Sequence, residues 1–115
     1  MKRLLVASVA HILLLAQFGD ACAAGPFDGE WGGSATSTVG RCKPAMVTLT
    51  IQGRDVTGQA RFGVDTMNIN GTVREDGTFG ATIGWQPLTG KFSEDGFEGT
   101  FKSGDCEWKM NLQRR

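Results

Sequence analysis

The chain has 115 residues, and its 12 Lys and Arg residues are balanced by 12 Asp and Glu residues. This length accommodates one domain, and the balanced charge argues against nucleic acid or an anionic membrane as the main partner, because both require a basic surplus to displace counterions. The 17 Gly and three Pro residues indicate many tight turns, which favours β structure over helix.

The first 24 residues have the three parts of a secretory signal peptide. Met1-Lys2-Arg3 supplies positive charge, an apolar run extends from Leu4 to Ala16, and small residues from Ala21 onward fit a signal peptidase site. The apolar run is too short to span a bilayer comfortably. We therefore expect cleavage after Ala23 or Ala24, an exported domain over residues 25–115, periplasmic or secreted, and no membrane span after cleavage.

Removal of residues 1–24 changes the chemistry of the mature chain. His11, the single His, and Cys22 leave with the signal peptide, and the sequence contains no Tyr. Cys42 and Cys106 remain, and two cysteines in an exported domain of this size predict one disulfide. Without His or a free Cys, and without a calcium-loop spacing, we expect no metal site and no cofactor.

From residue 25 onward, apolar and polar residues alternate in short runs, and no stretch has helical spacing behind an N-cap. Asp-Gly and Gly-containing turns separate the runs, with a further turn expected at Gln86-Pro87. The alternation predicts eight strands, near residues 27–35, 47–51, 56–62, 67–73, 79–85, 88–92, 97–101 and 106–112.

Short turns force each strand to pair antiparallel with the next, which gives a meander with one apolar face. Such a sheet buries that face and removes its edges by closing into a barrel, so the expected fold is an all-β, eight-stranded antiparallel meander barrel. A two-sheet sandwich of the same strands is the alternative. In the barrel, Cys106 at the start of the last strand lies near Cys42, just beyond the first, so their disulfide would clamp the seam.

A repeat supports the barrel. The pattern apolar-x-Gly-x-apolar occurs five times, and strand alternation points its Gly and both apolar positions inward. An inward Gly weakens a strand, so we expect it to allow sharp coiling and to make room for a neighbouring aromatic ring. The five glycines are Gly29, Gly58, Gly71, Gly90 and Gly99.

Three tryptophans are the candidate ligand contacts. We expect Trp31, Trp85 and Trp108 to face inward, where they either contact an apolar ligand at a barrel mouth or fill the core. Core filling is favoured, because small Gly and Ala residues share the interior and large side chains must fill it.

No catalytic residue is expected. Asp28 and Glu30 lie on one strand face, but both are expected to be outward and solvated, whereas catalytic carboxylates need environments that separate their pKa values. The Ser residues lack a His, and no Lys stands at a spacing that would activate them.

The start of the mature chain resembles known barrels. Gly29-Glu30-Trp31 is similar to the Gly-x-Trp signature that opens lipocalin and avidin barrels, and the run from Trp108 to Leu112 resembles the closing strand of avidin-type proteins. Phe27-Asp28-Gly29-Glu30-Trp31 together with two cysteines also resembles small exported bacterial β-barrel proteins. The resemblance implies a meander barrel. It does not imply biotin or lipid binding, because avidin-type proteins use a Tyr for biotin and lipocalins are much longer.

These observations favour a small exported, non-enzymatic binding or structural module, with a small apolar ligand or another protein as its partner. A protease-inhibitor-like envelope protein is the alternative, although Gly25-Pro26 offers only a very short N-terminal segment for such a role. An enzyme ranks behind both.

Overall fold

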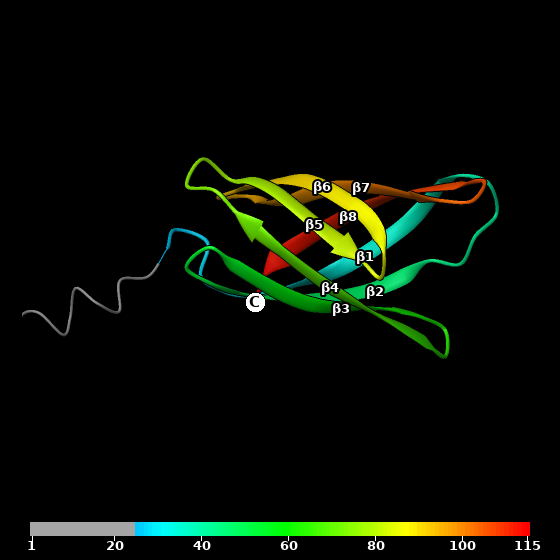
Figure 1. The fold of residues 1–115 in the computed structure, drawn as a ribbon, viewed down its shortest axis with the longest axis horizontal. Helices are drawn as coiled ribbons and strands as arrows, with labels where there is room; N and C mark the ends of the chain where they lie inside the picture. The colour runs from blue at the N-terminus through cyan, green and yellow to red at the C-terminus, as the bar shows by residue number, and fades with distance from the viewer. Residues whose placement is uncertain (1–24) are drawn as a thin grey trace, which may run out of the picture.

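The computed structural model describes residues 25–115, and the predicted signal peptide lies outside them. Eight antiparallel strands follow one another along the chain, and β1 pairs with β8, so the sheet closes into a meander barrel (Figure 1). This confirms the barrel and rules out the sandwich. The strands are β1 (Gly29–Val39), β2 (Ala45–Gln52), β3 (Asp55–Phe62), β4 (Asp65–Val73), β5 (Thr78–Ile83), β6 (Gln86–Ser93), β7 (Gly96–Ser103) and β8 (Cys106–Arg114).

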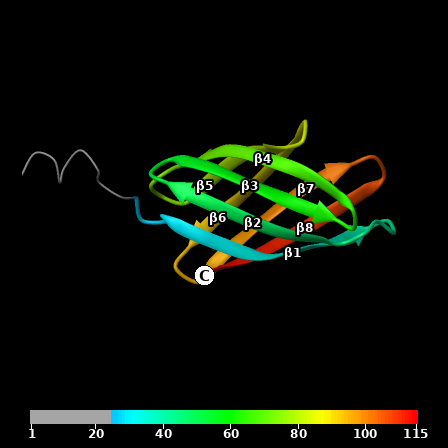
Figure 2. The ribbon, with the colours of Figure 1, turned by 90° about the horizontal axis from the view of Figure 1, so that it is seen from below.

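The barrel has two ends that differ in their connections. The terminal end holds the chain entry at residues 25–28, the C-terminus and the β2–β3, β4–β5 and β6–β7 connections. The disulfide end holds the β1–β2 connection with Cys42 and the β3–β4, β5–β6 and β7–β8 turns. Figure 2 shows β1 beside β8 and the strands running obliquely between the two ends. No helix in residues 25–115 is long and apolar enough to cross a membrane.

The interior is apolar throughout the described residues, with no buried polar or charged side chain. Aromatic rings fill its terminal end. The ring of Phe92 lies 4.9 Å from that of Trp31 and 4.5 Å from that of Phe97, centroid to centroid, and Phe79 packs edge-on against Phe92 and Phe97. The indole N–H of Trp31 donates to the carbonyl of Phe27 at 2.9 Å, so the buried tryptophan has a partner for its polar atom.

The apolar residues on both sides of all five glycines of the repeat are buried, as predicted, although Gly29 itself is exposed. At Gly90 and Gly99 the predicted reason also holds. A Cβ at Gly90 would lie 2.5 Å from Cζ of Phe97, and a Cβ at Gly99 would lie 2.6 Å from the same atom. The missing side chains therefore make room for the Phe97 ring. The predicted reason fails at Gly58 and Gly71, where an added Cβ would meet the neighbouring strand at Thr48 and Leu49 or at Gly80 and Ala81 and no aromatic ring. Gly29 differs again, because a Cβ there would meet no atom closer than 3.7 Å and its φ of 124° is what requires glycine.

The disulfide forms as predicted. Cys106 begins β8, Cys42 lies in the connection after β1, and the bond joins them with their Cα atoms 6.2 Å apart. It bridges the seam at which β1 and β8 close the barrel.

The prediction for Trp85 is wrong. β5 ends at Ile83, and the chain turns at Gly84-Trp85 rather than at Gln86-Pro87, since Pro87 already pairs with Thr82 in β6. Gly84 has a φ of 61°, a left-handed conformation that lets a two-residue turn form there. Trp85 therefore occupies the tip of the turn and is 82% exposed.

The apolar mouth as candidate functional site

The disulfide end of the barrel contains an apolar hollow of about 300 Å³, which we call the mouth. Strands β3 to β8 supply its lining. The apolar members form its walls, and the polar ones come from strand ends and turns at its rim. The lining residues are Phe62, Asp65, Met67, Ile83, Gln86, Phe101, Ser103 and Trp108.

One wall of the mouth is a packed aromatic group. Phe101 on β7 pairs directly with Trp108 on β8, and their rings stack with centroids 4.7 Å apart and planes 6° apart. Phe62 meets both rings edge-on, at 6.3 Å from Phe101 and 5.8 Å from Trp108. Three aromatic side chains in mutual contact therefore line this side of the hollow.

The position of Trp108 is fixed from outside the mouth as well. Its indole N–H donates to the carbonyl of Lys43 at 3.0 Å, and Lys43 follows Cys42 in the β1–β2 connection. Since Cys42 is bonded to Cys106, two residues before Trp108, the disulfide and this hydrogen bond hold the same connection against β8. These two contacts therefore hold Trp108 in place in the absence of a ligand.

The opposite side of the mouth is aliphatic. Ile83 is buried and Met67 is partly buried, and the turn after Ile83 packs against Met67, because a Cβ at Gly84 would lie 2.7 Å from its terminal methyl carbon. A methionine side chain adapts easily to different shapes. The aliphatic side of the mouth can therefore adjust its shape to a ligand, while the aromatic side stays fixed.

The three tryptophans lie in three different environments. Trp31 is fully buried at the terminal end and belongs to the core, whereas Trp108, 7% exposed, lines the mouth. Trp85 points into solvent at a turn tip beside the rim residue Gln86.

The sequence did not predict that Phe62 and Met67 line the mouth. The alternation of apolar and polar residues shows that both point inward, but it does not show how deep along the barrel they lie.

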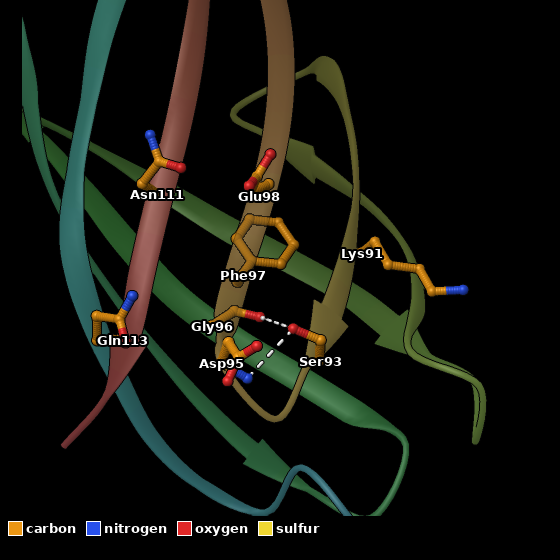
Figure 3. Close-up of a pocket in the computed structure, with 8 residues that line it drawn as sticks. All are labelled: Lys91, Ser93, Asp95, Gly96, Phe97, Glu98, Asn111 and Gln113. Carbon is orange, nitrogen blue, oxygen red and sulfur yellow. Dashed lines mark hydrogen bonds between the residues drawn. The ribbon is translucent and has the colours of Figure 1, made fainter.

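A second hollow, of about 310 Å³, lies on the outer wall of β6, β7 and β8 toward the terminal end (Figure 3). The hydroxyl of Ser93 donates to the carbonyl of Gly96 at 3.2 Å and accepts from the N–H of Asp95 at 3.3 Å. This serine therefore serves the β6–β7 turn. Figure 3 shows Lys91 extending away from Glu98, so the polar side chains do not converge on one point.

Of the two acidic residues expected on the first strand, Glu30 is exposed as expected, whereas Asp28 has a structural role, as does Asp76 in a turn. A carboxylate oxygen of Asp28 accepts from the N–H of Gly53 at 2.7 Å, so Asp28 is partly buried and ties the chain entry to the β2–β3 turn, rather than being solvated as expected. Asp76 accepts from the N–H of Thr78, and this hydrogen bond lowers the pKa of its carboxyl group. In residues 25–115 no three His, Cys, Asp or Glu residues lie close enough to hold a metal ion.

Comparison of the chain with protein-family models, with curated proteins and with solved structures found no match, so the barrel and its disulfide are established without assignment to a family.

Proposed function

We propose that the protein is a small exported, non-enzymatic binding module that holds an apolar ligand in the mouth. The contrast between the two ends of the barrel carries the proposal. Aromatic rings fill the terminal end, whereas the disulfide end keeps a hollow of about 300 Å³ with apolar walls and polar groups at its rim. Apolar walls with a few polar groups are the usual composition of a small-molecule site.

The size of the mouth limits the ligand. Its volume is at the lower end of the range for ligand pockets. Below the mouth, Ile69, Leu88 and Phe79 are buried and fill the interior, so a long chain has no room to extend inward. We expect a small aromatic or short aliphatic group that contacts the aromatic wall formed by Phe62, Phe101 and Trp108.

Two features support a non-enzymatic role outside the cytosol. Every buried side chain of the described residues is apolar, whereas catalytic acids and bases are expected in a cleft with polar groups inside it. The Cys42–Cys106 disulfide suits an oxidising compartment, and together with the predicted signal peptide it supports the periplasm or the extracellular space.

The protease-inhibitor-like alternative is less well supported. It requires an N-terminal segment free to enter an active site, but residues 25–28 are fastened to the barrel. Phe27 packs against Phe92, and the guanidinium of Arg114 donates to the carbonyls of Asp28 and Pro26 at 2.7 and 3.2 Å. We therefore favour the binding module.

Titration with the uncharged apolar dye N-phenyl-1-naphthylamine tests the proposal. We expect saturable dye fluorescence with the protein purified after export. Met67→Glu places a charge inside the mouth and should weaken dye binding about tenfold or more, because the carboxylate would lose its hydration. Thr66→Glu introduces the same side chain at the adjacent, exposed position and should leave binding unchanged.

Circular dichroism shows that each variant retains the barrel. Absence of saturable binding by the folded protein, or equal binding by the two variants, would contradict a ligand site in the mouth.

A further inference from the structure

The exposed apolar side chains gather at one end of the barrel. All four exposed large hydrophobic residues of the described chain lie in the half of the barrel that carries the disulfide, and none lies in the other half. Two of them occupy turn tips and are almost fully exposed, with Val64 at 96% and Trp85 at 82%. The four are Val39, Met46, Val64 and Trp85.

The backbone enforces this exposure. Val64 follows Gly63 in the β3–β4 turn, and Trp85 follows Gly84 in the β5–β6 turn; the two glycines have φ values of 63° and 61°. In such tight turns the residue after the glycine projects outward beyond the strand ends. Figure 1 shows both turns at the same end of the barrel, on the right. Two separate apolar tips thus flank the mouth.

Charge is also divided between the two halves of the barrel, although the described residues together are nearly neutral. The terminal half has eight acidic residues, Asp28, Glu30, Asp55, Glu75, Asp76, Glu94, Asp95 and Glu98, and five basic ones, Arg54, Arg74, Lys91, Arg114 and Arg115. The disulfide half has five basic residues, Arg41, Lys43, Arg61, Lys102 and Lys109, and three acidic ones, Asp65, Asp105 and Glu107. Lys109 and Glu98 form an ion pair at 3.9 Å across the middle of the barrel, so the remaining charges give the disulfide half a net charge of +1 and the terminal half −2. An anionic surface therefore favours the apolar end over the opposite one.

The barrel end is small for a protein interface. Eight strands spaced about 4.8 Å apart and tilted by about 40° form a backbone ring roughly 16 Å across, and the projected area of this end with its side chains is on the order of 500 Å². A stable protein–protein interface buries about 800 Å² of accessible surface on each partner, so a protein partner would have to cover the whole end. A lipid surface has no such requirement, because separate tips can each enter it.

We propose that the disulfide end docks on an anionic lipid surface, with Trp85 and Val64 entering the interfacial layer and the mouth facing the lipid. Tryptophan favours this layer because its ring is apolar and its N–H is polar. Arg41, Lys43, Arg61 and Lys102, which lie in or beside the connections of this end, are then near the phosphate groups, each contributing about 1 kcal/mol at most. The proposal goes beyond the ligand-binding function and holds whether or not a ligand fills the mouth.

Trp31 and Trp108 are buried, so a change in tryptophan emission on docking reports mainly on the exposed Trp85. With vesicles of equimolar phosphatidylcholine and phosphatidylglycerol, we expect a blue shift of the tryptophan emission and co-sedimentation of the protein purified after export. Trp85→Ser should abolish the shift and weaken co-sedimentation about tenfold, because it removes the apolar ring. Circular dichroism and dye binding to the mouth should stay unchanged in this variant, which separates docking from the proposed ligand function.

Two charge reversals provide a matched pair. Arg61 near the end of β3 and Arg54 in the turn before β3 are both exposed, at opposite ends of the same strand. Arg61→Glu should weaken binding to the anionic vesicles about tenfold. Arg54→Glu should have no such effect.

Three results would overturn the proposal: no binding of the folded protein to the anionic vesicles, equal binding by Trp85→Ser and the unchanged protein, or equal effects of the two charge reversals. A dimer in light scattering, or a protein complex, that requires Trp85 while vesicles do not bind would overturn it too, and would assign this end to a protein partner.

Discussion

Gly99→Ala tests whether the inward glycines beside Phe97, Gly90 and Gly99, make room for its ring. The new Cβ would lie 2.6 Å from Cζ and 2.8 Å from Cε2 of Phe97, and 2.9 Å from the carbonyl oxygen of Thr89. Carbon atoms in contact normally lie about 3.5–4.0 Å apart, so the ring must move by about 1 Å within a filled core. Overpacking of this kind costs about 1–3 kcal/mol, and we expect the free energy of unfolding to fall by about 2 kcal/mol.

Gly80→Ala is the matched control. Gly80 lies on β5 and is exposed, and a Cβ added to it would meet no atom within 4 Å beyond its chain neighbours. Its replacement should raise the free energy of unfolding by about 0.5–1 kcal/mol, because alanine restricts the unfolded chain more than glycine does. Urea unfolding followed by tryptophan emission measures both variants, and their m-values should match that of the unchanged protein.

A double-mutant cycle identifies Phe97 as the cause. Phe97→Leu alone creates a cavity, but in the Gly99→Ala background it also relieves the clash, so its cost should be about 1 kcal/mol smaller there. If Gly99→Ala is as stable as Gly80→Ala, or if the cycle gives no coupling, the glycine does not serve the ring.

Three further predictions concern the elements that hold the barrel. Replacing Cys42 and Cys106 together by Ser should lower the free energy of unfolding by roughly 4 kcal/mol in urea, from the loop-closure entropy of the 64-residue separation. Asp28→Ala should lower it by about 1–2 kcal/mol, because the partly buried N–H of Gly53 loses its acceptor; an unchanged urea midpoint would contradict that role. Because the pKa of Asp76 is lower in the folded state, its stabilising effect is complete above the unfolded-state pKa and is lost as pH falls through the folded-state pKa. Asp76→Asn should remove this acid-side loss, as measured by thermal unfolding below about pH 4.

Most of the fold follows from local patterns in the sequence. Strict alternation, as in Val47, Leu49 and Ile51, identifies the buried face of a strand without knowledge of its neighbours. The turn at Gly53-Arg54 and the one at Gly104-Asp105 are marked by glycine. Two turn signals lie close together after Ile83, and the prediction selected the wrong one. The β5–β6 turn forms at Gly84-Trp85 rather than at Gln86-Pro87. That displacement moved Trp85 from the expected core to solvent.

The mouth could not be predicted in this way. Phe62 and Met67 lie on either side of the β3–β4 turn, whereas Trp108 lies far away in the sequence on β8, and alternation assigns all three simply to the inside. Their depth along the barrel depends on how strand tilt and register combine when β8 closes on β1. The same closure decides that aromatic rings fill the terminal end while the disulfide end stays hollow.

Alternation, turn chemistry and residue type are local properties, and they were sufficient to predict the strand count, the order of pairing, the inward face and the partner of each cysteine. Two features emerged only from the closed barrel: which end keeps a hollow, and how deep each inward side chain lies along the barrel. Those features depend on position along the barrel axis, which a linear pattern does not encode and which closure of the sheet alone fixes.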